Sequence, residues 1–240
     1  TINHVNGNPS TINTRQHYLC HFNEFFRYCV SAGYLNKNPL ANTTLKERKN
    51  KKDEKAERIS SKNMLKVLKN MDKKFQIVME FAIQTGIRQG EQRALMWKHI
   101  DFDKRTVRIE QAIQSNIVGN VKSKTSYRTI SLTDEMCKKL QMIKLKRGVP
   151  GYNDFVFTIK NKRPIAAKSF IKYLHNAIDK SNLKRFRWHD LRHYFASILF
   201  NKFGQDYNIV TDLLGHASIE FTKSKYVHWF ENVEEQERVR

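Results

Sequence analysis

The sequence lacks any apolar run close to the roughly 18–20 residues that a membrane-spanning helix requires, and no charged-then-apolar signal segment opens it. Its three cysteines, Cys20, Cys29 and Cys137, are an odd number without a C-x-x-C pair, which argues against a disulfide framework or a zinc ribbon. These shortages argue against a membrane protein and a cysteine-stabilised secreted domain. They predict a soluble, intracellular protein.

Acidic residues are also few, since 23 Asp and Glu face 44 Lys and Arg, and the formal net charge is +21. So large an excess would only cause self-repulsion unless the protein binds a polyanion. Nucleic acid is the first candidate and an anionic membrane surface the second. With 240 residues, 40% of them hydrophobic, the chain can bury a sizeable core and form one large domain or two modest ones. Because it begins with Thr1 and not Met, we expect a fragment of a longer protein.

The N-terminal segment predicts a short helical module over residues 11–40. Pro9 and Ser10 offer a helix start, and Gly33 with Pro39 offers a stop and a turn. One stripe of an amphipathic helix is formed by apolar residues three or four apart, namely Tyr18, Leu19, Phe22, Phe25, Phe26, Cys29 and Val30. So small a module needs a packing partner to be stable.

A charged run with a single Ala, K-E-R-K-N-K-K-D-E-K-A-E-R, covers residues 46–58 and cannot bury apolar surface. We interpret it as a solvated linker that also has the charge to touch phosphate. The predicted domains are therefore an N-terminal helical domain over 1–45, the linker over 46–58, and a larger domain over 59–240 that ends in an acidic helical tail.

The larger domain is predicted to be mainly helical with a small antiparallel sheet. Ser60-Ser61 can cap a helix reaching Met71, a strongly apolar helix follows over 75–84, and another should end near Trp97. Residues 107–112 and 130–132 have β character and are separated by a polar stretch with Lys122 and Lys124 in its turn. Helices return from Asp134 onward. The fold class is thus α+β, mainly α.

Several polar residues interrupt this apolar pattern. Arg88 follows Thr85-Gly86 at a predicted helix start, where close backbone approach and a guanidinium suit an anionic group. The alternative is a local ion pair with Glu91, one helical turn away. His189 and Arg192 are three apart in W-H-D-L-R-H-Y and project from one helix face.

An imidazole can exchange a proton, and a guanidinium can grip two phosphate oxygens. Metal binding by His189 and His193 is an alternative because they are four residues apart, but no further ligand cluster follows Asp190. Each histidine by itself could also be a core residue.

Three further positions read as ordinary when each is taken alone. His216 follows an apolar helix and a Gly, as in a structural turn; Tyr226 would be a half-buried packing residue; Lys124 would be one of many surface lysines.

Taken together, two arginines, two histidines, a lysine and a tyrosine without a carboxylate cluster describe phosphoryl transfer without a metal. Cationic side chains would neutralise the pentacoordinate phosphate, and the tyrosine would be the nucleophile. No P-loop, Ser-His-Asp arrangement or pair of metal-binding carboxylates is recognisable.

The order of motifs resembles the tyrosine recombinase family, and within it the phage and conjugative-element integrases. The motifs are T-G-I-R-Q-G-E, S-K-T-S-Y-R-T-I, H-D-L-R-H, L-L-G-H-A-S and T-K-S-K-Y-V-H, and S-T-I-N-T-R-Q-H-Y-L with G-Y-L-N-K-N-P-L resembles the family's core-binding domain. The resemblance implies a helical core-binding domain followed by a tyrosine-recombinase catalytic domain. It implies cleavage and rejoining of DNA through a 3′-phosphotyrosyl intermediate, with neither metal, ATP nor another cofactor.

Residue by residue, the resemblance makes Arg88 a clamp on the scissile phosphate and Lys124 the general acid for the leaving 5′ hydroxyl. His189 would support proton transfer, and Arg192 would grip the other phosphate oxygens. His216 would hydrogen-bond the phosphate, and Tyr226 would be the nucleophile, with Tyr207 and Tyr194 as alternatives. Glu91 and Asp190 would orient the arginine and the helix.

The resemblance also implies partners and a setting: double-stranded DNA, a homo-tetramer on two duplexes, a mobile element, and the nucleoid in a prokaryotic cytoplasm. Three other readings stay open. They are a basic DNA-binding regulator without catalysis, a type IB topoisomerase that relaxes supercoils as a monomer, and a metal-dependent nuclease. The short core-binding segment argues against the topoisomerase.

Overall fold

The structure is a computed structural model that describes residues 4–5, 8–9, 11–45, 59–121, 126–158 and 162–226. Its internal contacts divide the chain into two compact units, residues 1–57 and 58–240. The charged run at 46–58 and the C-terminal acidic tail lie outside the described residues. The domain boundaries at 45 and 59 therefore remain predictions.

The first unit contains the predicted N-terminal helix. The strands β1 (His4–Val5) and β2 (Asn8–Pro9) pair antiparallel, and α1 spans Ile12–Ser31. The N-cap is Thr11, whose hydroxyl accepts a hydrogen bond from the Thr14 backbone N–H at 3.2 Å, so the helix begins just after the Pro9-Ser10 signal. Four aromatic side chains of α1 are exposed, namely Tyr18, Phe22, Phe25 and Tyr28. The helix has little core of its own, as its length predicts.

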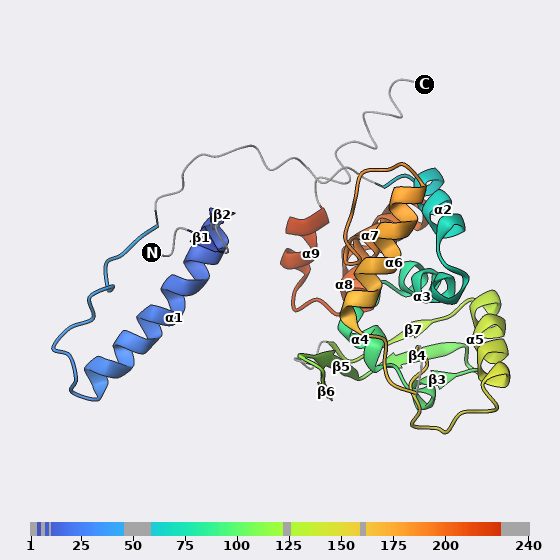
Figure 1. The fold of residues 1–240 in the computed structure, drawn as a ribbon, viewed down its shortest axis with the longest axis horizontal. Helices are drawn as coiled ribbons and strands as arrows, with labels where there is room; N and C mark the ends of the chain where they lie inside the picture. The colour runs from blue at the N-terminus through green and yellow to red at the C-terminus, as the bar shows by residue number, and fades with distance from the viewer. Residues whose placement is uncertain are drawn as a thin grey trace, which may run out of the picture. The chain divides into compact units, whose positions relative to one another are not determined.

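The second unit is mainly helical with short strands (Figure 1). Its helices are α2 (Ser61–Asn70), α3 (Lys73–Thr85), α4 (Gln89–Ala94), the 3-10 helix η1 (Trp97–His99), α5 (Asp134–Lys146), α6 (Ala167–Lys180), α7 (Asp190–Phe203), α8 (Tyr207–Leu214) and α9 (Ile219–Tyr226). Its strands are β3 (Ile100–Asp101), β4 (Thr106–Ile109), β5 (Gln111–Gln114), β6 (Ile117–Asn120) and β7 (Arg128–Ser131). Among the described residues, no helix has both the length and the apolarity that crossing a membrane takes.

The core of this unit lies between α2, α3, α6 and α7, which gather at one end in Figure 1. The sequence signals hold here: Ser60 caps α2, and the apolar run at 75–84 becomes the buried helix α3. Phe75 stacks on Tyr173 with ring centroids 4.3 Å apart and meets Phe170 edge to face. This aromatic packing fixes α3 and α6, and α7 packs against α3. The helix pair α3 and α7 carries much of the site described below.

The predicted sheet divides into two. β3, β4 and β7 form one antiparallel sheet in which Val107 faces Ile130, as the β character of both segments predicts. β5 and β6 form a separate two-stranded ribbon in which Ala112 faces Gly119, a division that the sequence did not predict. The division follows Glu110, which belongs to neither ladder.

The helix that the sequence predicts to end near Trp97 is α4, and it ends three residues earlier than predicted, at Ala94. Beyond it, the Trp97 backbone N–H donates to the Asp154 carbonyl at 3.0 Å, and Met96 pairs with Phe155 as an isolated β-bridge. These distant partners satisfy the backbone that an extended helix would have used. The local pattern could not predict them.

Candidate functional site

The turn between α3 and α4 presents the first arginine. Gly86 ends α3 in the left-handed conformation with φ +59°, and Arg88 is the N-cap of α4, as the T-G-I-R motif predicts. The Arg88 backbone N–H and its guanidinium donate to the two oxygens of Glu91 at 2.9 and 2.8 Å. The Arg88 side chain is 35% exposed, so these bonds leave it partly accessible to solvent. The local ion pair with Glu91 that the sequence offered as an alternative is therefore present.

A second arginine, Arg128 at the start of β7, completes the pairing of Glu91. Its guanidinium donates to both Glu91 oxygens at 3.1 and 2.7 Å, and these two side chains are only 4% and 3% exposed. Burial alone would raise the pKa of Glu91, but the hydrogen bond and charge of Arg128 together with the charge of Arg88 outweigh it and lower the pKa. Glu91 is thus a buried carboxylate that joins two guanidinium groups. The sequence alone predicted no role for Arg128.

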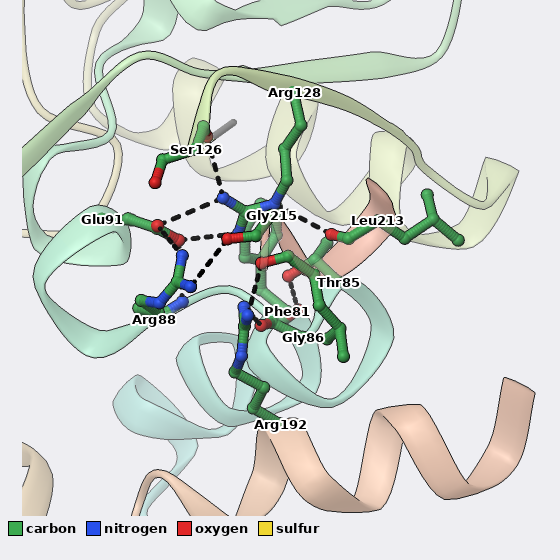
Figure 2. Close-up of polar contacts among 11 residues, drawn as sticks. Phe81, Thr85, Gly86, Arg88, Glu91, Ser126, Arg128, Arg192, Leu213 and Gly215 are labelled. Atoms are coloured by element: carbon green, nitrogen blue, oxygen red, sulfur yellow. Dashed lines mark hydrogen bonds and ion pairs between the residues drawn. The ribbon is translucent and has the colours of Figure 1, made fainter. Parts of the chain in front are cut away.

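Three guanidinium groups bind three consecutive backbone carbonyls where α8 ends. The pairs are, in order, Arg128 with Leu213, Arg192 with Leu214 and Arg88 with Gly215. Figure 2 shows these side chains converging from three separate segments of the chain. The last carbonyls of a helix carry partial negative charge and have no partner within the helix. They therefore hold three cations close together where like charges would otherwise repel.

Arg192 is the most buried of the three, with 2% of its surface exposed. It lies on α7, and its Nη1 also donates to the Gly86 carbonyl at 2.8 Å. Burial lowers the pKa of Arg192 to about 9, and the nearby charges of Arg88 and Arg128 act in the same direction. A guanidinium placed among other cations in a dry site has a strong electrostatic preference for an arriving anion.

His189 and Asp190 lie at the start of α7. His189 is the N-cap residue, just before the helix and not within it. Burial lowers its pKa, so the ring is neutral at neutral pH. The Asp190 carboxylate accepts from the Arg187 backbone N–H at 2.7 Å and pairs with the Arg187 guanidinium at 2.9 Å. Asp190 thus holds the helix start, and its described ion pair is with Arg187 and not with Arg88 or Arg192.

His216 follows directly after the three carbonyls. Its Nδ1 lies 2.9 Å from the Thr222 hydroxyl, which fixes the ring. Burial lowers the pKa of His216 to about 3, and the charges of Arg192 and Arg88 add to this, so the ring is neutral at neutral pH. The rings of His216 and Tyr226 are nearly parallel, with centroids 6.4 Å apart.

Tyr226 is fully buried, which differs from the half-buried residue with a wet hydroxyl that its local sequence predicts. Its hydroxyl lies 2.9 Å from Nδ1 of His193, a residue that the sequence suggested only as a metal ligand or a core histidine. Burial raises the pKa of Tyr226 to about 12, although the charges of Arg192 and Arg88 oppose the rise. Arg88, Arg192, His216 and Tyr226 are therefore gathered at one place from four distant motifs.

The remaining candidates are Lys124 and the two alternative tyrosines. Lys124 falls outside the described residues, as does Lys122. The hydroxyl of Tyr194 donates to Ser61 at 3.1 Å, and the ring of Tyr207 packs against Phe200. In the part of the chain that the structure describes, no group of three His, Cys, Asp or Glu residues could hold a metal ion.

Gly86 offers a direct test of the packing beneath the site. A Cβ at Gly86 would meet the Phe195 ring at 2.3 Å, whereas a Cβ at Gly204, which ends α7 with nearly the same φ of +57°, would meet nothing within 4 Å. Both Ala variants carry the left-handed strain of about 1–2 kcal/mol. We expect Gly86→Ala to lose a further ~1–3 kcal/mol from overpacking, measured by urea unfolding. Equal losses in the two variants would contradict this account.

With the geometry in place, comparison with known proteins gives consistent matches. Residues 57–232 match the sequence profile described as "Phage integrase family". The chain is 28% identical over 232 residues to a "Tyrosine recombinase XerC-like" protein of Caldanaerobacter subterraneus subsp. tengcongensis, covering 85% of this chain and 59% of that protein. It is 27% identical over 174 residues to the ICEBs1 integrase of Bacillus subtilis, covering 68% and 47%. The chain thus spans roughly half the length of these relatives.

Solved structures show the same fold. The Tn1549 transposon integrase, in complex with a circular intermediate DNA, superposes with a TM-score of 0.74 at 20% identity over 96% of this chain and 80% of that one. The XerH site-specific recombinase, bound to its difH substrate before cleavage, superposes with a TM-score of 0.65 at 22% identity over 89% and 61%. The predicted fold class, mainly α with a small antiparallel β component, is confirmed.

Proposed function

This chain belongs to the phage integrase family of tyrosine recombinases, and on that premise we propose that it cuts and rejoins double-stranded DNA at a specific site. The observation that carries the proposal is the convergence at the end of α8. Arg192 and Arg88 donate to the carbonyls of residues 214 and 215, and the ring of His216 lies parallel to that of Tyr226. Two cations, a neutral imidazole and a phenol are the groups that transfer of a phosphodiester to a tyrosine requires.

The two arginines would bind the scissile phosphate. Each guanidinium has five N–H donors. The Arg88 guanidinium donates to Glu91 and to the Gly215 carbonyl, and part of the Arg88 side chain stays exposed. Arg192 would supply charge from the buried side of the site. Because both groups are already fixed before DNA arrives, little reorganisation opposes stabilisation of the pentacoordinate phosphorus.

Tyr226 would then attack the phosphorus. A bond forms between its Oη and phosphorus, the bond from phosphorus to the 5′ oxygen breaks, and Lys124 would protonate that oxygen. The bond energy is kept in the 3′-phosphotyrosine, so a 5′ hydroxyl from a partner strand can reverse the step without metal or ATP. Tyr226 is fully buried in this structure, so productive DNA binding would have to open the site around its hydroxyl.

The two histidines would assist. Because Nδ1 of His216 is engaged with Thr222, its Nε2 is the nitrogen that would meet a phosphate oxygen. His189, neutral at the start of α7, would support proton transfer, and Asp190 would keep that helix start in place through Arg187. Glu91 would orient Arg88.

The assembly follows from the same premise. We propose that the domains at 1–45 and 59–240 clamp one duplex, with the charged run at 46–58 crossing its backbone. Two duplexes carry four cleavage points, which requires a homo-tetramer. The ICEBs1 and Tn1549 relatives are integrases of mobile elements. We infer that this chain acts likewise on mobile-element DNA, at the nucleoid in a prokaryotic cytoplasm.

Phosphate contacts should dominate the affinity, which predicts a steep salt dependence. The logarithm of the binding constant should fall with the logarithm of salt concentration by about 0.9 per phosphate neutralised. For about six neutralised phosphates, affinity should fall roughly 10³-fold between 50 and 200 mM salt. Fluorescence anisotropy with a labelled duplex measures this slope. A slope flatter than about −2 would argue against a clamp that uses the +21 charge of the chain.

The cleavage activity is tested with nicked duplexes. A binding site is first selected from a random DNA pool by the protein itself, and duplexes with nicks scanned across that site are then incubated with the protein in EDTA. Loss of the short fragment beyond the nick traps the covalent intermediate. We expect a slowly migrating protein–DNA adduct on a denaturing gel.

Each other result favours a different reading. A bound duplex without any adduct would favour a DNA-binding regulator, and cleavage that EDTA abolishes would favour a metal-dependent nuclease. Relaxation of supercoiled DNA by a monomer, without strand exchange between two duplexes, would favour a type IB topoisomerase.

A further inference from the structure

His193 contacts the reactive atom of the proposed nucleophile. Its Nδ1 lies 2.9 Å from the Tyr226 hydroxyl, and the two ring centroids are 5.5 Å apart at an interplanar angle of 60°. His193 belongs to α7 and Tyr226 ends α9, so the contact joins two helices through residues 33 positions apart in the sequence. A group that takes the proton of the attacking oxygen must lie within hydrogen-bonding distance of that oxygen, and His193 does.

Both partners of this hydrogen bond are uncharged at neutral pH. Burial lowers the pKa of His193 to about 4, so its imidazole is neutral at neutral pH and has one unprotonated nitrogen. Burial raises the pKa of Tyr226 to about 12, so the phenol keeps its proton. Proton transfer from the phenol to His193 requires the tautomer protonated at Nε2, in which the phenol donates and Nδ1 accepts.

We propose that His193 is the base that receives the Tyr226 proton when Tyr226 attacks the phosphodiester. The inference rests on the proposed function. As the bond from Oη to phosphorus forms, the Oη–H proton moves to Nδ1 of His193 and the bond from phosphorus to the 5′ oxygen breaks. The leaving oxygen takes a different proton, assigned above to Lys124. In the rejoining step His193 returns its proton to the tyrosine oxygen.

The neighbours of His193 favour this role once DNA is bound. After burial, the charges that depress its basicity are those of His189, Arg192 and Arg187, while Asp190 opposes them. Arg192 is the adjacent residue on α7, so a phosphate anion bound by Arg192 would offset part of that effect and strengthen the base. Before DNA arrives the weak base leaves the phenol protonated. The arrangement thus links activation of the nucleophile to occupancy of the phosphate site.

His189 is the other histidine of this segment and the competing candidate. Its ring meets the His193 ring edge to face with centroids 5.1 Å apart, whereas the described hydrogen bond of the Tyr226 hydroxyl goes to His193. The hydrogen-bond geometry therefore assigns proton uptake from Tyr226 to His193. His189 would support proton transfer from its position next to His193.

Two substitutions separate proton uptake from positioning. His193→Asn places an amide group where Nδ1 stood, so it can still accept the phenol hydrogen bond but cannot take its proton, and His193→Ala removes both functions. Adduct formation is followed in a single turnover on the nicked duplex. We expect both variants to form adduct about 10²–10⁴-fold more slowly than the wild type, with unchanged circular dichroism and DNA affinity. Added imidazole should restore part of the rate of adduct formation to His193→Ala. This rescue tests the proposal even if His193→Asn does not fold.

A duplex with sulfur in place of the bridging 5′ oxygen identifies the affected step, because a thiolate leaves without protonation. The sulfur should restore cleavage to Lys124→Ala but not to His193→Asn. The proposal is overturned if His193→Asn forms adduct at a rate within threefold of the wild-type rate, or at a rate far above that of His193→Ala without imidazole. It is also overturned if the sulfur substrate restores cleavage to His193→Asn. Faster cleavage by His193→Ala would show instead that the bond restrains the nucleophile. Failure of the wild type to form any adduct would refute the proposed function itself, a result distinct from all of these.

Discussion

Replacing Tyr226 by Phe is expected to abolish the covalent protein–DNA adduct, because no other atom of that side chain can attack phosphorus. The substitution removes one oxygen and keeps the ring, which packs with Phe200, Val210 and Leu214 in the smaller core cluster. The lost hydrogen bond to His193 should cost only about 0.5–1.5 kcal/mol of stability. The variant should therefore fold, bind DNA and give no band above background on the denaturing gel.

Matched controls are available at the two alternative tyrosines. Tyr194→Phe removes a hydroxyl bonded to Ser61, and Tyr207→Phe removes one from a ring that packs on Phe200. Neither ring has a described contact with an arginine of the site, so both variants should form adduct at rates close to that of the wild type. An adduct that survives Tyr226→Phe but disappears in one of these variants would move the nucleophile there.

Local signals predicted the helices well. Ser60 caps α2 and Gly86 ends α3, because a hydroxyl cap and a left-handed glycine act through the nearest backbone and need no distant partner. The end of α4 and the division of the sheet were predicted less well. Both depend on contacts across the chain, such as the backbone pairing of Trp97 with Asp154, which no local pattern encodes.

The candidate site shows the same division. The motifs predicted Arg88, Arg192, His216 and Tyr226, and the structure brings all four together. Arg128, however, lies in the same motif as Lys124, and the sequence predicted no role for it. Its partner Glu91 lies 37 residues earlier, and only the fold reveals the pairing.

The role of His193 is hidden in the sequence for a related reason. Its distance of four residues from His189 suggests a metal site, and nothing in the sequence around it points to a tyrosine 33 residues later. For both Arg128 and His193 the residue type is visible in the sequence but its partner is not. Both residues lie within a recognised motif, and their contacts arise only because the fold brings a distant segment against that motif.

Replacing Glu91 by Gln should destabilise the second unit by about 3–5 kcal/mol, the usual cost of removing one partner from a buried ion pair. Glu91 accepts from Arg128, which is 4% exposed, and from Arg88. Without the carboxylate charge, the Arg128 guanidinium stays buried beside other cations with only carbonyls to oppose it. Urea unfolding at pH 7 measures the loss. The matched control is Glu135→Gln, since Glu135 pairs with Lys139 on the surface, where solvent screens the pair, and should change little.

The pH dependence of the free energy of unfolding is a second test of the Glu91 prediction. Because the pKa of Glu91 is lower in the folded chain than its ordinary value of 4.5, its stabilisation is present above about pH 4.5 and is lost as the pH falls through the folded-state pKa. The gap between wild type and Glu91→Gln should therefore narrow in acid. Arg88 also loses its fixed orientation in this variant, so at temperatures where it remains folded, adduct formation should slow while DNA affinity changes little. A variant as stable and as active as Glu135→Gln would show that the backbone carbonyls alone hold the three arginines in place.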